Sequence, residues 1–167
     1  MYSKARIAGH PIHPMLVSIP IGSFVLALLS SLIYLGSGSA FWIEASYWLS
    51  LSGIATGLFA ALFGLIDWWV IPDHASAKTA ANWHMILNVL NILLFAAGWW
   101  LLGGLAGPVG RDIGIPLALQ ALGVGVLLVT GWLGGEMVYR HHVAVEPVAP
   151  EEQALVDEYE HIRRRAA

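Results

Sequence analysis

The sequence contains no cysteine and very little charge. Without cysteine it cannot form disulfides, hold an iron–sulfur cluster through thiolates or use a thiol nucleophile. Only 11% of its residues are charged, against about 25% in an ordinary soluble domain, so the chain cannot cover a globular surface with polar groups. The small net charge of −3 gives no argument for a nucleic-acid partner. These absences indicate an integral membrane protein.

Four long apolar stretches take the place of a polar surface. Each is close to the roughly 20 residues that a helix needs to cross a hydrocarbon core. We interpret the first as retained rather than cleaved as a signal peptide, and we predict a helix kink at Pro20. Glycines and prolines between the stretches end each helix. The predicted spans are residues 15–35, 47–71, a third that begins between 76 and 84 and ends near 102, and 116–139.

The segment 151–165 follows the last span and has a different character. Its acidic residues come first and its three arginines last, which is the order that suits a helix dipole. We therefore predict a short surface helix there. The fold class is all-α: a polytopic membrane protein with a four-transmembrane-helix up-down-up-down bundle in residues 1–145 and a cytoplasmic, partly helical tail in residues 146–167.

The basic residues predict the orientation of this bundle. Positively charged residues gather on the cytoplasmic side of membrane proteins, and here only Arg111 falls on the side opposite the termini. Both termini are therefore predicted to be cytoplasmic. The basic residues on the side of the termini are Lys4, Arg6, Lys78, Arg140 and Arg163 to Arg165.

The stretch Gly9-His-Pro-Ile-His-Pro-Met places two histidines immediately before the first span. Pro11 pushes His10 away from helical backbone angles, and Pro14 suits the first turn of a helix. We expect His13 to be a cap-like residue at the mouth of that helix. Two imidazoles are then held by stiff backbone where the chain enters the membrane.

All seven histidines fall on the predicted cytoplasmic side, together with two carboxylates set in apolar sequence, Asp67 and Glu136. An ionisable group at membrane depth costs several kcal/mol unless it is paired or ligated, so these residues are candidates for a functional site. The interval from His13 to Asp67 resembles that from His84 to Glu136. This similarity predicts two duplicated hairpins related by a pseudo-two-fold axis.

Imidazoles and carboxylates presented at one depth can form a mixed site for a transition metal such as iron or zinc. Haem b is the rival cofactor, with His13 and His84 as axial ligands, Asn88 on the same helix face as His84, and Arg140 or Lys78 near the propionates. The residues alone do not decide between them. The predicted metal ligands are His10, His13, Asp67, His84 and Glu136, and the predicted cofactor-binding residues are His13, His84, Asn88 and Arg140.

Four motifs together resemble a family of bacterial four-helix inner-membrane proteins that carries a "domain of unknown function" label. The resemblance covers about residues 8–145 and implies a bacterial inner-membrane location. Some members look like fusions to a Rieske iron–sulfur domain, which implies electron transfer nearby, although this sequence lacks that domain. The motifs are GHPIHPM at 9–15, FGLIDW at 63–68, HMILN at 84–88 and GWLGGEMVYRH at 131–141.

The leading hypothesis is a small membrane subunit that binds a metal or haem and exchanges electrons with a redox partner protein. A proton or ion relay along Asn88, Asn91 and Gln120 is the second hypothesis. A structural or assembly protein without a cofactor is the third. All three hypotheses share the lipid bilayer as a partner. The sequence indicates no catalytic reaction, and it leaves open whether the chain forms a homo-oligomer.

Overall fold

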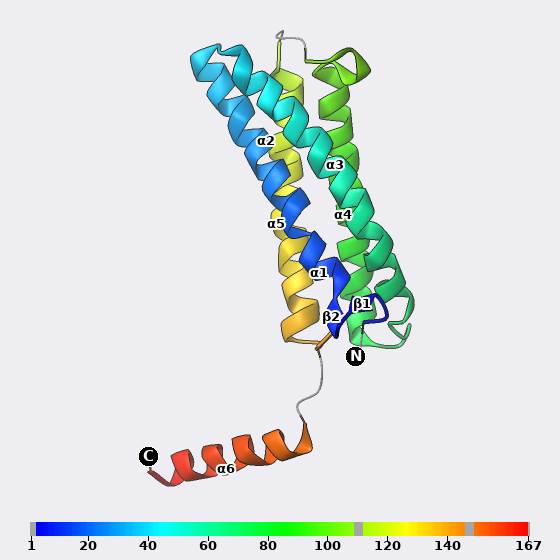
Figure 1. Ribbon diagram of the computed structural model, residues 1–167, viewed down its shortest axis with the longest axis vertical. Coiled ribbons are helices and arrows are strands. Elements are labelled where there is room, and N and C mark those ends of the chain that lie inside the picture. The colour runs from blue at the N-terminus through cyan, green and yellow to red at the C-terminus, as the bar shows by residue number, and fades with distance from the viewer. Residues whose placement is uncertain (1–2, 109–111, 146–148, 167) are drawn as a thin grey trace.

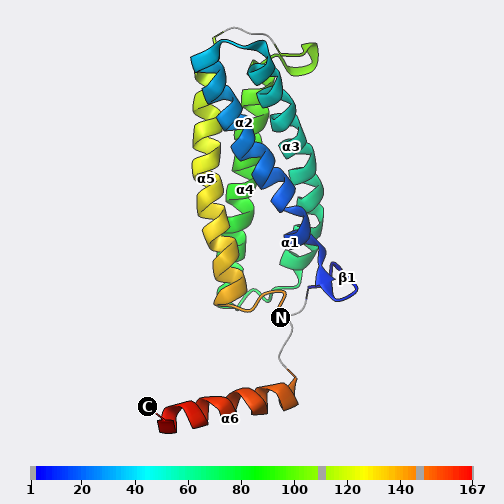
Figure 2. The same ribbon diagram turned by 60° about the vertical axis from the view of Figure 1, so that its left-hand side comes forward.

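The computed structural model describes residues 3–108, 112–145 and 149–166. The long helices run up and down beside one another and form a bundle (Figure 1). The N-terminal segment and α6 lie at one end of this bundle, called here the terminal end, and the opposite end is the loop end (Figure 2). The elements are β1 (Arg6–Ile7), β2 (His10–Pro11), α1 (Ile12–Leu16), α2 (Ser18–Ser37), α3 (Ala40–Trp69), α4 (Ser76–Leu101), η1 (Gly104–Ala106), α5 (Gly114–Tyr139) and α6 (Pro150–Ala166).

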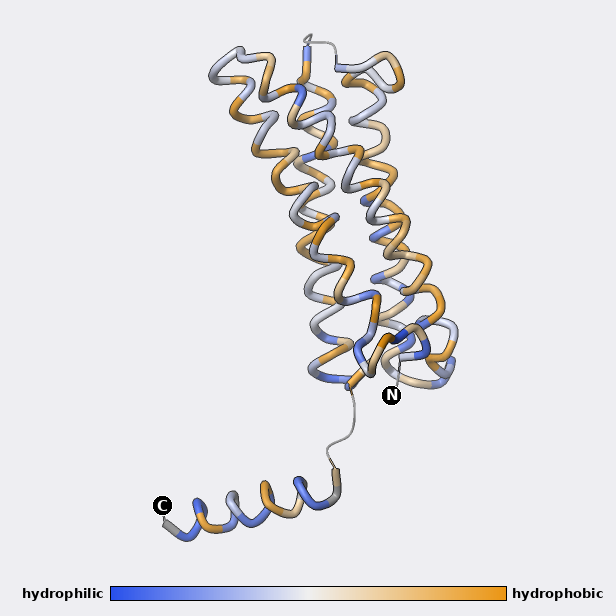
Figure 3. The backbone as a smooth tube through the Cα atoms, viewed as in Figure 1, coloured by the Kyte–Doolittle hydropathy of each residue, from blue (hydrophilic) through white to orange (hydrophobic). Residues whose placement is uncertain are grey.

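The bundle confirms the all-α polytopic fold. Four segments are long and apolar enough to cross a membrane, namely Ile12–Ser37 together with α3, α4 and α5. The tube coloured by hydropathy shows apolar residues along the full length of the bundle and a mixed pattern on α6 (Figure 3). Large apolar side chains on the outside of the bundle therefore face where lipid would lie. Arg111, used to predict the orientation, lies outside the described residues.

A short hairpin precedes the first helix and was not predicted. Strands β1 and β2 pair antiparallel through a two-residue turn at Ala8 and Gly9, whose φ angles are 49° and 83°. Positive φ at both central residues is typical of tight hairpin turns. The helix then starts at Ile12, with Pro11 as its extended N-cap. His13 consequently lies inside the first turn of α1 rather than at its cap.

The first span is interrupted where Pro20 predicts a kink. The break between α1 and α2 falls at Val17. Pro20 has no N–H to donate to the carbonyl of Leu16, four residues earlier, and its ring crowds that carbonyl. This interruption sets the direction of the short helix that carries His13.

The centre of the bundle is a pair of stacked phenylalanines. The rings of Phe24 on α2 and Phe95 on α4 have centroids 4.1 Å apart, and both side chains are buried. Each ring packs against a glycine on the neighbouring helix, Gly53 on α3 and Gly123 on α5. A Cβ atom added at either glycine would lie 2.5 Å from the ring. The helices can therefore approach closely only because these positions carry no side chain.

Gly123→Ala is expected to destabilise the bundle by about 1–3 kcal/mol, the usual cost of overpacking a close-packed core. Its methyl group would force the Phe95 ring away from its stacked partner. Thermal unfolding in detergent measures the effect. Gly125→Ala is the matched control on the same helix, because nothing lies within 4 Å of its added Cβ. Equal melting temperatures for the two variants would contradict this packing.

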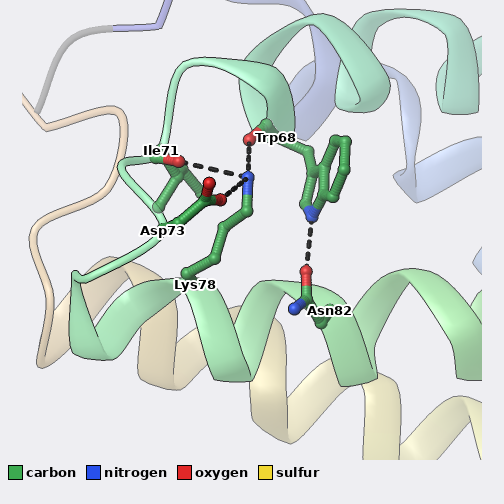
Figure 4. Close-up of polar contacts among 5 residues, drawn as sticks. All are labelled: Trp68, Ile71, Asp73, Lys78 and Asn82. Atoms are coloured by element: carbon green, nitrogen blue, oxygen red, sulfur yellow. Dashed lines mark hydrogen bonds and ion pairs between the residues drawn. The ribbon is translucent and has the colours of Figure 1, made fainter.

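Lys78 closes the terminal end of α3 (Figure 4). Its Nζ donates hydrogen bonds to the carbonyls of Trp68, at 2.9 Å, and Ile71, at 3.1 Å. The same atom lies 3.8 Å from the centroid of the Trp68 ring and 3.6 Å from the carboxylate of Asp73. The indole N–H of Trp68 in turn donates to Asn82 at 2.7 Å. Lys78 thus joins the C-terminal end of α3 to the start of α4. A basic group near the C-terminal end of α3 also suits the dipole of that helix.

Lys78→Met is expected to lower stability by about 1–3 kcal/mol, because it leaves buried carbonyl acceptors unpaired. Asp73→Asn is the matched control, since Asp73 is 97% exposed and an exposed ion pair contributes at most about 1 kcal/mol. Both variants are compared by thermal unfolding in the same detergent. A larger loss in Asp73→Asn than in Lys78→Met would show that the ion pair, rather than the capping, matters.

Candidate functional site

The bundle brings His13 and His84 together across its interior. His13 comes from α1 and His84 from α4, and both side chains are half-buried. Their ring centroids lie 6.5 Å apart and their planes are nearly perpendicular, at 85°. We call these two residues the histidine pair. It lies in the terminal half of the bundle, on the terminal-end side of the Phe24–Phe95 stack.

Each imidazole is fixed by a hydrogen bond to a neighbouring helix. His13 Nδ1 lies 2.9 Å from the carbonyl oxygen of Ala60 on α3, and His84 Nδ1 lies 2.9 Å from that of Thr130 on α5. A carbonyl can only accept, so each Nδ1 carries the proton and donates it. Each Nε2 is then the ring nitrogen with a free lone pair. This is the arrangement that orients histidine ligands in metal sites.

Glycines one turn beyond the accepting carbonyls make room for the rings. A Cβ added at Gly64 would lie 2.9 Å from the His13 ring, and one added at Gly134 would lie 3.3 Å from the His84 ring. The helix surface beside each imidazole therefore has to be free of side chains. The sequence showed both glycines, but it did not show which histidine each would contact.

The two halves of the bundle repeat this arrangement. Positions 13 and 84 differ by 71, as do positions 24 and 95, which hold the stacked phenylalanines. The equivalent positions of α3 and α5 differ by 70, at 53 and 123, 60 and 130, and 64 and 134. Histidine, phenylalanine, carbonyl acceptor and glycine thus recur together. These contacts support the predicted pseudo-two-fold relation, with the histidine pair at equivalent positions.

Asp67 lies outside this repeated arrangement, and its carboxylate binds the N-terminal segment. Its carboxylate accepts hydrogen bonds from the backbone N–H of Lys4 at 2.9 Å and of Ala5 at 3.2 Å. The hydroxyl of Ser3 lies 2.7 Å from one of its oxygens. Ala5 also accepts a bond from the N–H of Ile12, the first residue of α1. Asp67 therefore anchors the segment that leads into His13, instead of lying beside the histidines.

Asp67→Ala is expected to release this segment, because hydrogen bonds to a charged group contribute about 1.5–3 kcal/mol. Amide hydrogen exchange at Lys4 and Ala5 should become at least about tenfold faster, since 1.4 kcal/mol corresponds to a factor of ten. Asp73→Ala, which removes an exposed carboxylate, should leave that exchange unchanged. Unchanged protection of Lys4 and Ala5 in Asp67→Ala would refute the anchoring role.

The other predicted site residues do not converge on the histidine pair. Glu136 forms an ion pair with Arg140 on the next turn of α5, at 2.9 Å. His10 Nδ1 bonds to the carbonyl of Ala8 in the exposed hairpin, and the Asn88 amide donates to the carbonyl of His84. Within residues 3–108, 112–145 and 149–166, no three or more histidine, cysteine or acidic side chains are grouped to hold a metal ion. The predicted five-residue ligand set is not assembled, because its carboxylates bond elsewhere.

A hollow of about 420 Å³ lies near the terminal end but does not include the histidine pair. It is shallow and apolar, and it opens on the outside of α3. Its position beside Trp69, which is 77% exposed, is that of a lipid-facing groove near an interface. The residues that line it are Lys4, Leu65, Ile66, Trp69 and Val70.

A second polar layer lies on the loop-end side of the phenylalanine stack. The Gln120 amide donates to the hydroxyls of Ser46, at 2.9 Å, and Ser50, at 3.3 Å. Ser46 also bonds to Ser31, at 2.7 Å, and all four side chains are buried. The Gln120 Oε1 atom has no hydrogen-bond partner among the described residues. Gln120 could be noted from the sequence, but the serines that face it could not.

Comparison with known proteins identifies a family for this chain. A family model described as "Predicted membrane protein (DUF2231)" covers residues 9–147, which includes the four membrane-spanning segments and both histidines of the pair. No curated protein and no solved structure matches the chain.

Proposed function

Because the chain belongs to the DUF2231 family of predicted membrane proteins, we propose a function that rests on residues within the matched region. The chain is a membrane redox protein that holds one metal centre between His13 and His84, with haem b as the favoured cofactor. It exchanges electrons with a redox partner protein from the cytoplasmic side of a bacterial inner membrane. The terminal end is taken as cytoplasmic because Lys4, Arg6 and Arg140 lie there.

The observation that supports this proposal is the separation of the two imidazoles. An imidazole nitrogen binds a transition metal at about 2.0–2.1 Å, so the ring centroid lies roughly 3.2 Å from the metal. Two imidazoles on opposite sides of one metal then have centroids about 6.4 Å apart, whereas two ligands of a tetrahedral metal have centroids about 5.2 Å apart. The observed 6.5 Å would allow His13 and His84 to hold one metal between them, as in a haem iron bound by two imidazoles.

The hydrogen bonds of the pair add to this argument. Both Nδ1–H groups donate to backbone carbonyls, which leaves Nε2 to bind the metal and keeps the rings in place before it arrives. Since the chain has no cysteine, a haem could be neither attached through thioethers nor ligated by a thiolate. A non-covalent haem with two histidine ligands fits this chemistry, and it would supply a one-electron carrier.

The first experiment is purification of the full chain in mild detergent from cells supplied with iron and a haem precursor, followed by an absorption spectrum and metal analysis. We expect a Soret band, with sharp α and β bands on reduction, and about one haem per chain. Metal without a Soret band would replace haem by a simple metal ion. A preparation with neither would overturn the redox proposal and favour the structural role.

A proton relay is a second candidate, and the buried polar layer favours it. Gln120 Oε1 and Asn91 Oδ1 lie inside the bundle without a described partner, and a buried unpaired oxygen is costly unless water reaches it. The Phe24–Phe95 stack, however, lies between Gln120 and the histidine pair. Proton flux into reconstituted vesicles that falls at least about tenfold in Gln120→Leu would favour the relay over the redox role.

A further inference from the structure

Helix α6 lies beyond the residues matched by the family model and carries an exposed apolar stripe. Leu155, Tyr159 and Ile162 follow one another at steps of four and three residues, which places them on one helix face. Their side chains are 66%, 67% and 58% exposed. Steps of four and three are also the spacing of the seam between two paired helices.

The charges of α6 are divided between its two ends. Glu151 and Glu152 lie in its first turn, and Arg163, Arg164 and Arg165 lie in its last turn. A second copy of the helix that runs antiparallel would place acids opposite arginines at both ends. A parallel copy would place like charges opposite each other, which is unfavourable.

The position of α6 relative to the bundle makes the antiparallel arrangement the symmetric one. α6 lies across the direction of the long helices, below the terminal end (Figures 1 and 2). Two copies in one membrane are related by a two-fold axis along the membrane normal, because each bundle must keep its orientation. Such an axis reverses any helix that lies parallel to the membrane. The symmetry therefore produces the pairing that the charges favour.

We propose that α6 is a dimerisation helix that pairs antiparallel with α6 of a second copy of this chain. Leu155 of one copy then faces Ile162 of the other, and Tyr159 lies close to the two-fold axis. The membrane surface is the less suitable occupant, because the acidic side chains of α6 outnumber its arginines and anionic lipids would repel them. Confinement of both chains to one membrane raises their effective concentration, which helps so short a helix to pair.

The absence of cysteine makes disulfide cross-linking of the full chain in native membranes a clean test. Tyr159→Cys is expected to give a covalent dimer on mild oxidation, at least about fivefold more than Asp157→Cys on the opposite helix face. Leu155→Cys and Ile162→Cys, with different tags, should cross-link to each other more than either does to itself. Preferred self-linkage of Leu155→Cys would mean a parallel pair, and equal yields at positions 157 and 159 would mean random collision; either result overturns the proposal.

Charge reversal provides a second measurement in the Tyr159→Cys background. Glu152→Arg and Arg165→Glu should each lower the dimer yield, because each places like charges opposite one another. The two reversals combined should restore the yield. A yield that stays low in the combined variant, or is unaffected by either reversal, would show that α6 contacts something other than an antiparallel copy, such as lipid or another protein.

Discussion

Replacing either histidine of the pair is expected to remove the bound cofactor almost completely. His13→Asn and His84→Asn are the informative variants, because the asparagine amide can still donate to the carbonyl of Ala60 or Thr130. Each change removes the Nε2 ligand but retains the hydrogen bond that holds neighbouring helices together. Since loss of an outer hydrogen-bonding partner alone commonly costs 10–100-fold in metal affinity, loss of a ligand should cost more than about 100-fold. The measurement is the haem or metal content per purified chain.

The two variants should be affected equally, because the histidines occupy equivalent positions in the two halves. His74→Ala is the matched control: this histidine is exposed in the loop between α3 and α4, and its loss should leave the content unchanged. Circular dichroism and elution volume confirm that the variants are folded. Retention of full cofactor by either asparagine variant would exclude a centre held by both imidazoles.

The equivalence of the halves also explains how much of the fold could be predicted. Long apolar runs identify the four spans because lipid demands continuous hydrophobic helices, and the structure changes only their ends. α3 begins at Ala40 rather than Tyr47, because residues 40–46, AFWIEAS, continue the same helix. The hairpin of β1 and β2 could not be foreseen, since it depends on a left-handed backbone at Ala8, a residue that rarely adopts it.

The candidate site was predictable in its imidazoles but not in its carboxylates. Sequence spacing places Asp67 and Glu136 near the same end of the bundle as the histidines, and the structure agrees with that depth. The depth of a carboxylate in the bundle does not specify the direction in which its side chain points around the helix, nor which donor group lies nearest to it. Arg140, on the next turn of the same helix, forms an ion pair with Glu136, and the backbone amides of the N-terminal segment donate hydrogen bonds to Asp67. The partners of Asp67 depend on the folded path of residues 3–5, which no periodicity reveals.

The perpendicular imidazole planes lead to a spectroscopic prediction for the haem-loaded protein. Each imidazole bound to a haem iron would donate π electrons along the normal of its ring. Parallel rings would separate the energies of the two iron d orbitals that accept them, whereas perpendicular rings would leave these energies nearly equal. At 85°, the ferric protein should show a low-spin electron paramagnetic resonance signal with one unusually large g value, rather than the rhombic signal of parallel rings.

A single methyl group tests whether the protein sets this angle. Gly64→Ala places a Cβ 2.9 Å from the His13 ring, so the ring has to shift or turn. The hydrogen bond from its Nδ1 to the carbonyl of Ala60 restricts how it can do so. The large g value should decrease, or the haem should be lost, in this variant. Gly131→Ala on α5 is the control, since nothing lies within 4 Å of its added Cβ. A rhombic wild-type signal would mean that the rings rotate freely on metal binding, and that the carbonyls of Ala60 and Thr130 do not orient them.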